Sequence, residues 1–184
     1  MLDILLFGTE AAEFRLLEMI HDIFESRFTD FIMPRITALG NAGIIWIILA
    51  AVLLCIPRYR RCGAVLAAGL LAGLVFGNLL IKPLIHRPRP CWLYEVQLIT
   101  KIPSDYSFPS GHTYSSFTAA FLLLRYDKRR GIAALALAVL IAFSRMYLYA
   151  HFPTDVLGGI VLAVAVSTAV TAIDKRIETK ESVK

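Results

Sequence analysis

Five long apolar runs, separated by short charged loops, constrain this chain more than any other feature of its sequence. They cover residues 39–57, 63–81, 112–125, 131–149 and 156–173. All but the third approach the ~20 residues with which a helix crosses a hydrocarbon core of about 30 Å. A content of 58% hydrophobic and 18% charged residues agrees with this, since globular proteins hold about 45–50% and about 25%. The sequence predicts an all-α, polytopic helical membrane bundle of about five spanning helices.

The third run, residues 112–125, is short for a spanning helix and has a polar first turn. A helix that begins inside the membrane, below its surface, would account for both features. In the second run, Gly69, Gly73 and Gly77 recur every four residues. This spacing of small residues predicts that other helices pack closely on that run.

The first 35 residues differ from the rest of the chain. Between Leu5 and Arg27 and just beyond, apolar residues recur at three- and four-residue steps among acidic ones, as is typical of an amphipathic helix. They are Phe14, Leu17, Ile20, Phe24 and Phe28. The charges are too many for a spanning helix, so we expect this helix to lie flat on the membrane surface; a helix in a soluble core is the alternative. We expect one membrane-embedded domain over residues 1–184, with an interfacial segment at 1–35 and a transmembrane core at 39–173.

A net charge of +5 could indicate nucleic-acid binding, but the basic residues are spread among the loops between apolar runs. They form clusters at residues 58–61, 125–130 and 175–184. The positive-inside rule places this side in the cytoplasm and the 82–111 loop and the 144–155 turn outside. We therefore expect a multi-pass protein of the cell membrane whose active site faces the extracytoplasmic side. Lys82, Arg87 and Arg89 are exceptions to the rule, which suggests that they have another function.

The outer loop begins with Lys82 and continues to Arg89 and Pro90, with further prolines at 83 and 88. Proline has no amide donor and restricts the residue before it, so we expect a stiff, non-helical path after the second span. Such a path can direct Lys82 and Arg89 toward one point. A compact ammonium and a planar guanidinium suit a phosphate with several oxygens. Contact with anionic lipid headgroups is the alternative.

The sequence Pro109-Ser110-Gly111-His112 stands directly before the third apolar run. Free N–H groups at a helix N-terminus bind anions, Gly111 allows a close backbone approach, and Ser110 adds a hydroxyl. The helix dipole disfavours protonation of His112 unless an anion is bound. Helix capping by Ser110 is the alternative interpretation.

Ser144-Arg145, His151 and Asp155 form a third group. Pro153 suits the first turn of a helix, which would place Asp155 one turn beyond His151. A carboxylate bonded to one imidazole nitrogen fixes the tautomer and raises the basicity of the other nitrogen, so His151 is a candidate nucleophile. A structural ion pair at the helix start is the alternative. Arginine and histidine within a membrane are costly and typical of functional sites.

If the apolar runs are helices, the three groups meet at one outer end of the bundle. They bring together three cations, a helix N-terminus and two histidines. The sequence has no cluster of Asp, Glu, His or Cys at metal-ligand spacing. We therefore predict neither metal nor cofactor, and the cations must stabilise developing charge. The combination predicts phosphoryl transfer through a covalent histidine intermediate. A non-catalytic lipid-phosphate binder or a transporter is the competing hypothesis.

This arrangement resembles the type-2 phosphatidic acid phosphatase superfamily of membrane lipid phosphatases. The family signature is Lys, six residues, Arg-Pro; then Pro-Ser-Gly-His; then Ser-Arg, five residues, His, three residues, Asp, and every fixed position is present. The resemblance implies that His151 attacks phosphorus, that Asp155 orients it, and that His112 protonates the leaving group and then activates water. The residues that it implies for phosphate binding are Lys82, Arg89, Ser110, Gly111 and Arg145.

The N-terminal helix looks like that of small bacterial members, and an outward-facing site on a small chain looks like the bacterial undecaprenyl-diphosphate phosphatases. The resemblance therefore implies hydrolysis of undecaprenyl diphosphate to undecaprenyl phosphate. Phosphatidylglycerophosphate, phosphatidic acid and lipid A phosphates are alternatives, because members that act on them share the motifs. The expected partners are a lipid phosphate or diphosphate and membrane lipids, with no nucleic acid. We expect the 91–107 loop to border the headgroup, and Arg87 either to touch a second phosphate or to be a solvated charge.

Overall fold

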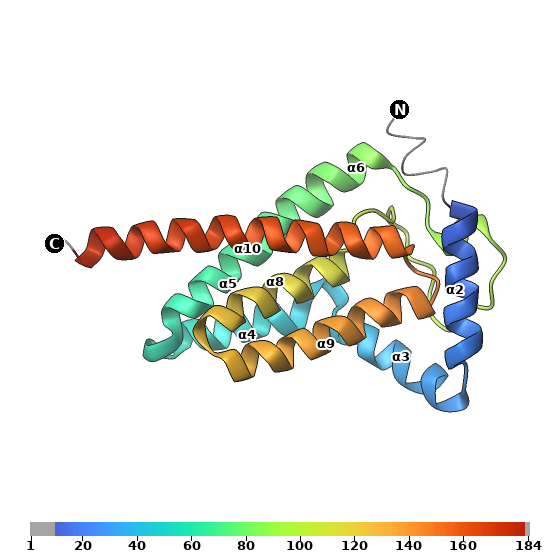
Figure 1. Cartoon of the computed structure of the whole chain (residues 1–184), viewed down its shortest axis with the longest axis horizontal. Helices are drawn as coiled ribbons and strands as arrows, with labels where there is room; N and C mark the ends of the chain where they lie inside the picture. The colour runs from blue at the N-terminus through green and yellow to red at the C-terminus, as the bar shows by residue number, and fades with distance from the viewer. Residues whose placement is uncertain (1–9, 183–184) are drawn as a thin grey trace.

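The computed structural model describes residues 10–182, and over this range the chain forms helices and loops without a strand. The α-helices are α2 (Glu10–Phe24), α3 (Arg27–Leu39), α4 (Ile44–Cys55), α5 (Arg60–Gly73), α6 (Lys82–Ile85), α7 (Pro90–Leu93), α8 (Gly111–Tyr126), α9 (Lys128–Tyr147) and α10 (Pro153–Ser182). Other helical turns are η1 (Asn41–Gly43), η2 (Pro57–Tyr59) and the π-helical η3 (Leu74–Ile81). In Figure 1, α4, α5, α8, α9 and α10 form an elongated bundle, and α2 crosses one end of it. The predicted all-α bundle is confirmed.

Within the described part of the chain, three helices are long and apolar enough to cross a membrane. They cover Pro57–Leu93, Lys128–Tyr147 and Pro153–Lys180, with 37, 20 and 28 residues. Arg27–Leu39 and Asn41–Cys55 meet the same criterion only as a pair, bent by 41°. α8 has 16 residues, as its short apolar run predicted, and is not among them. By length and composition, the described residues thus hold three candidate spans, or four with the bent pair, against a predicted number of about five.

The predicted first span, residues 39–57, is interrupted near its start. α4 begins only at Ile44 and has 12 residues. Before it, Ala42 and Gly43 both adopt left-handed backbone conformations, with φ of 50° and 66°, so the helix of α3 cannot continue. Gly40 precedes this break, and a Cβ at Gly40 would lie 2.8 Å from Cδ2 of His112. The break therefore allows α8 to begin close beside the end of α3.

The second predicted span continues through Pro83, which we expected in a non-helical path. α5, η3 and α6 follow one another without a gap as far as Ile85, and the chain turns at His86, which has a φ of 53°. A proline removes one helical hydrogen bond and clashes with the carbonyl four residues earlier. The wider π turns of η3, directly before α6, accommodate this conflict. The non-helical path therefore begins at His86 and leaves Lys82 on the last helical turn.

α8 packs against α5, α9 and α10 and forms the centre of the bundle. Its contact with α5 is close, because the Tyr114 hydroxyl donates to the carbonyl of Gly69 at 2.7 Å and a Cβ on Gly73 would overlap the Tyr114 ring. On the same helical line, a Cβ on Gly77 would lie 3.1 Å from Leu162 of α10. The predicted close packing at these three glycines is confirmed.

α10 begins at Pro153, as predicted, and continues to Ser182, well beyond the end of its apolar run. Asp174 is buried near that end and pairs with Arg61 at 2.9 Å and with Arg125 at 2.8 Å. These ion pairs join two of the predicted basic clusters to α10. They lie at the end of the bundle opposite to α2 (Figure 1).

α2 packs on the bundle rather than lying apart from it. The helix buries Glu13, Phe14 and Leu17, and the Phe14 ring stacks on Tyr94 with centroids 3.7 Å apart. Phe14 and Leu17 also belong to a buried cluster with Phe152, next to the start of α10. The predicted amphipathic helix is thus present from Glu10, and the first nine residues of that segment lie outside the described residues. Its location on a membrane surface stays a prediction.

Candidate active site

The predicted site residues meet at the end of the bundle that α2 crosses (Figure 1). Lys82 and Arg89 come from α6 and the segment after it, residues 110–112 from the start of α8, and Arg145, His151 and Asp155 from the turn between α9 and α10. Arg89, His112 and Arg145 line a cavity of about 520 Å³, together with residues 100–105 of the outer loop. The contacts described below connect the other predicted residues to this cavity.

His151 is buried behind the cavity, with 1% of its surface exposed, and its two ring nitrogens face different partners. Nε2 lies 3.0 Å from Nη1 of Arg89. Because a guanidinium only donates hydrogen bonds, Nε2 is the acceptor and the ring proton is on Nδ1. Burial, and then the charge of Arg89, lower the pKa of His151 well below its usual range. The imidazole is therefore neutral at pH 7, with a lone pair on Nε2.

Nδ1 of His151 does not reach Asp155 directly, contrary to the predicted hydrogen bond. It lies 3.6 Å from Oδ2 of the carboxylate, because Ser107 is placed between them. Nδ1–H donates to the Ser107 hydroxyl at 3.2 Å, and this hydroxyl donates to Oδ2 of Asp155 at 2.5 Å. The backbone N–H of Ser107 is fixed on the carbonyl of Arg87 at 2.8 Å. Asp155 therefore selects the His151 tautomer through Ser107.

Asp155 is completely buried on the first turn of α10. Its Oδ2 accepts a further hydrogen bond from the N–H of Phe152 at 2.7 Å, and its Oδ1 accepts from Nη1 of Arg87 at 2.7 Å. Arg87 has 0% of its surface exposed. Both predictions for Arg87, contact with a second phosphate and a solvated charge, are therefore wrong. Its guanidinium is directed to carboxylates inside the protein.

Lys82 and Arg89 converge on one point, as predicted, and that point is the carboxylate of Asp105. Nζ of Lys82 lies 2.5 Å from Oδ2, and Nη2 of Arg89 lies 2.7 Å from Oδ1. Burial opposes ionisation of Asp105, but the hydrogen bond from Lys82 and the charge of Arg89 hold its pKa below the usual value. Asp105 is thus an anion bound between the two cations. A phosphate that binds both cations must displace it.

Arg145 lines the same cavity with 7% of its surface exposed. Its Nη1 donates to the Thr37 hydroxyl of α3 at 2.8 Å, whereas its buried Nε has no hydrogen-bond partner among residues 10–182. Its backbone carbonyl accepts from the N–H groups of Ala150 and His151, which closes the turn after α9. A buried guanidinium with an unused donor is suited to bind an anion.

The start of α8 is held against α10. The N–H of Ser110 donates to the carbonyl of Asp155 at 3.1 Å, and a Cβ on Gly159 would lie 2.9 Å from the Ser110 carbonyl oxygen. The Ser110 hydroxyl accepts from the hydroxyl of Thr113 at 3.0 Å and from its N–H at 3.4 Å. The capping role of Ser110 is confirmed. Gly111 follows as the first residue of α8, and anion binding by this helix start stays a prediction.

His112 faces the cavity from the first turn of α8. Its Nε2 lies 2.9 Å from Oδ1 of Asn41, a residue that the left-handed break before α4 brings to the site. An amide oxygen accepts hydrogen bonds, so Nε2 carries the ring proton of His112 in this arrangement. The two histidines therefore present opposite functions, a proton at His112 and a lone pair at His151.

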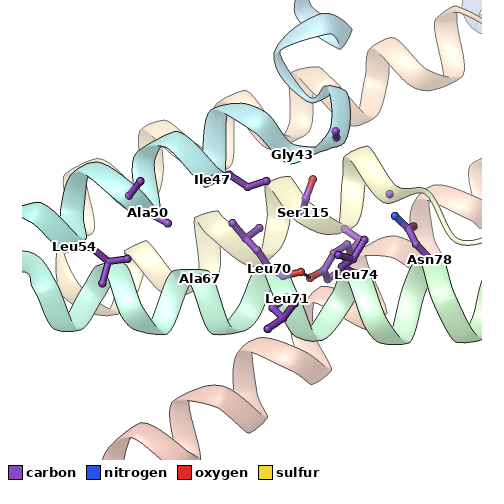
Figure 2. A pocket seen from close by; sticks show the side chains of 14 residues that line it. Gly43, Ile47, Ala50, Leu54, Ala67, Leu70, Leu71, Leu74, Asn78 and Ser115 are labelled. Atoms are coloured by element: carbon purple, nitrogen blue, oxygen red, sulfur yellow. Dashed lines mark hydrogen bonds between the residues drawn. The ribbon is translucent and has the colours of Figure 1, made fainter.

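A second, apolar groove of about 370 Å³ runs between α4 and α5 to the start of α8. Figure 2 shows its walls, which are built from Ile47, Ala50 and Leu54 on one side and from Ala67, Leu70, Leu71 and Leu74 on the other. At the end near the site lie Gly43, Asn78, Gly111 and Ser115. The groove thus leads along the bundle to the residue that precedes His112.

Ser107 and Asn41 belong to the site although no motif predicted them, and Asp105, in the loop expected to border the headgroup, is bound by Lys82 and Arg89. Ser107 and Asp105 lie a few residues before Ser110, so their closeness to the motif was an available signal. No comparable signal existed for Asn41, because only the backbone break that follows it brings its side chain to His112. Among the described residues, no group of three or more His, Cys, Asp or Glu side chains is arranged to hold a metal ion.

Comparison with known proteins places the chain among membrane phosphatases. The sequence model of the PAP2 superfamily matches residues 62–178. Undecaprenyl-diphosphatase from Sulfolobus acidocaldarius is 35% identical over 117 residues, which are 62% of this chain and 56% of that protein. The chain thus spans little more than half the length of that relative. Undecaprenyl-diphosphatase BcrC from Bacillus subtilis is 33% identical over 139 residues, 74% of this chain and 70% of that protein.

The fold agrees with the sequence match. The crystal structure of a transmembrane PAP2-type phosphatidylglycerolphosphate phosphatase from Bacillus subtilis superposes with a TM-score of 0.76 at 25% identity. The superposition covers 95% of this chain and 90% of that one. This neighbour and the apolar helices identify a membrane protein, and the relatives are named as phosphatases of lipid phosphates. The predicted family is confirmed: the chain belongs to the PAP2 superfamily of phosphatases.

Proposed function

We propose that this protein is a metal-independent lipid phosphatase that hydrolyses undecaprenyl diphosphate to undecaprenyl phosphate through a phosphohistidine intermediate. The observation that carries the proposal is the state of His151. Its Nε2 has a lone pair directed at Arg89, and its Nδ1 proton is held by Ser107 and Asp155. A histidine used only for structure does not require this separation of lone pair and proton.

In the first step, the terminal phosphate displaces the Asp105 carboxylate and binds Lys82 and Arg89. The lone pair on Nε2 of His151 attacks phosphorus, the bond from phosphorus to the bridging oxygen breaks, and its electron pair leaves with the lipid. His112 acts as the imidazolium, which the bound anionic phosphate stabilises, and gives one of its two ring protons to that oxygen. The phosphorylated imidazole keeps its proton on Nδ1, so it carries a positive charge that Asp155 stabilises through Ser107.

In the second step, water replaces the lipid beside the phosphohistidine. His112, now a neutral imidazole, accepts a proton from the water on its free ring nitrogen as the water oxygen attacks phosphorus. The bond between phosphorus and Nε2 breaks, its electrons return to the imidazole, and inorganic phosphate leaves. Throughout both steps, Lys82, Arg89 and Arg145 stabilise the charge on the non-bridging oxygens. Their three positive charges provide the charge stabilisation that a metal ion provides in other phosphatases.

The apolar groove between α4 and α5 supports a lipid as the substrate (Figure 2). We assign the chain of the lipid to it, because its walls are almost entirely aliphatic and it ends beside Gly111. A lipid whose phosphate lies in the cation cavity can extend its hydrocarbon along these walls. Burial of the chain there removes apolar surface from contact with headgroups and water.

The names of the two relatives support undecaprenyl diphosphate as the substrate. Undecaprenyl-diphosphatase is the name of both relatives described above, and we transfer that substrate to this chain. A phosphatidylglycerophosphate or phosphatidic acid phosphatase is the second candidate, because the structural neighbour that covers 95% of the chain acts on phosphatidylglycerolphosphate by its name. The residues proposed for catalysis are the same in both cases.

Phosphate release in detergent should distinguish these substrates. We expect undecaprenyl diphosphate to give a kcat/KM at least about tenfold above that of phosphatidylglycerophosphate or phosphatidic acid, a preference worth ~1.4 kcal/mol. The reverse order would keep the mechanism and change the substrate. Binding of each lipid without phosphate release would identify a non-catalytic lipid-phosphate binder or a transporter instead.

The groove provides a matched control for this assay. Ala67→Phe fills the groove and should raise the KM for each long-chain lipid by about tenfold. It should leave hydrolysis of the soluble p-nitrophenyl phosphate unchanged, since that ester has no chain to place. Ala64→Phe adds the same bulk on the exposed side of α5 and should affect neither substrate. Equal losses with both variants would contradict the assignment of the groove.

We also propose that the site faces the outside of the cell membrane, as the positions of the basic clusters favour. In a chain whose native cysteines have been replaced, Glu95→Cys in the outer loop should react with a membrane-impermeant maleimide on intact cells. Arg129→Cys, on the first turn of α9, should react only after lysis. Both residues are exposed. The opposite pattern would invert the orientation.

A further inference from the structure

Arg87 is a buried cation that the reaction described above does not use. Its Nη1 lies 2.7 Å from Oδ1 of Asp155, and its Nη2 lies 2.8 Å from Oε1 of Glu13. Its guanidinium carbon lies 4.5 Å from the centre of the Phe152 ring. A guanidinium with 0% exposure would be costly without paired carboxylates. Three carboxylates therefore surround the guanidinium: Asp155 of α10, Glu13 of α2 and, at 3.9 Å from Nε, Glu10 of α2.

Glu13 binds the start of α10 as well as Arg87. Its Oε2 accepts from the backbone N–H of Thr154 at 3.0 Å and from the Thr154 hydroxyl at 2.6 Å. Thr154 directly precedes Asp155, and its N–H belongs to the first turn of α10, where no carbonyl of the helix is available. The same Thr154 hydroxyl is within 2.5 Å of Nη1 of Arg87. Glu13, Thr154 and Arg87 thus form one closed set of contacts around Asp155.

The Glu13 carboxylate comes from outside the part of the chain that the family model covers. The superfamily match begins at residue 62, whereas Glu13 lies on α2, at Glu10–Phe24. α2 is fixed in place by Phe14 and Leu17, which are buried in a cluster with Tyr149 and Phe152. Glu13 itself is 8% exposed. An interfacial helix that served only as a membrane anchor would not need a buried acid that binds Arg87 and Thr154 beside the catalytic carboxylate.

We infer that Glu13 and Arg87 are positioning residues for the reaction, and that α2 is part of the catalytic apparatus. Arg87 holds Oδ1 of Asp155, which leaves Oδ2 directed at Ser107 and so keeps the Nδ1 proton of His151 in place. Glu13 holds Arg87 at 2.8 Å and, with Glu10 at 3.9 Å, shares the charge of the guanidinium with Asp155. The inference rests on the proposed function, since it assigns these residues to the His151 nucleophile.

Substitution of Glu13 by glutamine tests the inference with little change of shape. Glutamine places an amide donor where Glu13 accepts from Arg87 or Thr154, so one of those contacts is lost. We expect kcat to fall by about 10–100-fold, as is typical when a group that orients an active-site residue is removed. The KM, and the inhibition constant of inorganic phosphate, should stay within about twofold, because Lys82, Arg89 and Arg145 are not changed. Glu13→Asp retains the carboxylate and should recover part of the loss in kcat.

Glu18→Gln, on an exposed position of the same helix, is the control and should behave as the unmodified protein. The inference is overturned if Glu13→Gln leaves kcat unchanged, or if it raises KM alone. A loss of phosphate inhibition along with kcat also overturns it, since Glu13 would then support the fold of the whole site. Failure of the proposed function has a different signature, which is the absence of turnover in the unmodified protein.

Discussion

Replacement of His151 by alanine is expected to reduce phosphate release by about 10⁴-fold or more, as removal of a nucleophile does in other covalent hydrolases. The variant loses the Nε2 lone pair while Lys82, Arg89 and Arg145 remain. Its affinity for inorganic phosphate should therefore change little. Turnover and phosphate inhibition, measured on the same preparation, separate loss of chemistry from loss of the fold. Substantial turnover in the variant would refute the nucleophile assignment.

The covalent intermediate is directly observable in this experiment. A substrate with radiolabelled phosphate, quenched in alkali during turnover, should leave label on the unmodified protein and none on His151→Ala. The label should be lost in acid, since a phosphorus–nitrogen bond is labile there. His86→Asn is the matched control, because His86 lies in the same outer region, is exposed, and has a left-handed φ of 53° that asparagine tolerates. It should retain both label and turnover.

The same assay tests the proposed independence from metal ions. Orthovanadate resembles pentacoordinate phosphorus and should inhibit the unmodified protein. A chelator should not, because Lys82, Arg89 and Arg145 provide the positive charge. A strong loss of activity with the chelator, restored by a divalent cation, would revive a metal mechanism.

The sequence predicted the convergence of the site because its residues lie at the ends of helices. Arg145 and His151 flank the turn between α9 and α10, and His112 begins α8. Each apolar helix is forced to place its polar end at the bundle end, so three motifs at such ends must approach each other. Spacing alone then indicated which side chains could interact.

The contacts between the motifs could not be predicted from the sequence in the same way. Ser107 separates His151 from Asp155, and a spacing of four residues cannot reveal a side chain inserted from another loop. The sequence predicts for Arg87 either contact with a second phosphate or a solvated charge, whereas its burial depends on Glu13, more than 70 positions away in the sequence. Polar residues satisfied by distant partners carry no local pattern. They can be found only when the chain has been folded.

The interruption of the first apolar run could not be predicted for a related reason. Hydropathy measures apolar length, and residues 39–57 and 112–125 are apolar without being straight, long helices. The left-handed conformations of Ala42 and Gly43 divide the first run, and α8 is enclosed by other helices. Both the break before α4 and the short length of α8 help to form the site. The break places Asn41 beside His112, and α8 begins at the cavity.

Replacement of His112 by asparagine is expected to have an effect that depends on the leaving group. Loss of a general acid typically costs about 10²–10⁴-fold, and the loss should be largest for a lipid phosphomonoester, whose alkoxide must be protonated to leave. A diphosphate releases a lipid phosphate, which is far less basic, so the first step should suffer less. For p-nitrophenyl phosphate, whose phenolate leaves without a proton, the first step should be nearly unchanged.

The second step has no such alternative, because water remains the nucleophile for every substrate. With p-nitrophenyl phosphate, the His112→Asn variant should therefore release a burst of nitrophenolate equal to the amount of enzyme, followed by slow turnover as the phosphohistidine accumulates. Asn41→Ala removes only the hydrogen-bond partner of His112 and should give no burst beyond that of the unmodified protein. If His112→Asn instead abolishes the burst, His112 binds phosphate or supports the fold rather than transferring protons. A burst with slow turnover would assign to His112 both the proton transfer to the leaving group and the proton transfer from water. His112 lies where the start of α8, the break before α4 and the cavity lined by Arg89 and Arg145 meet.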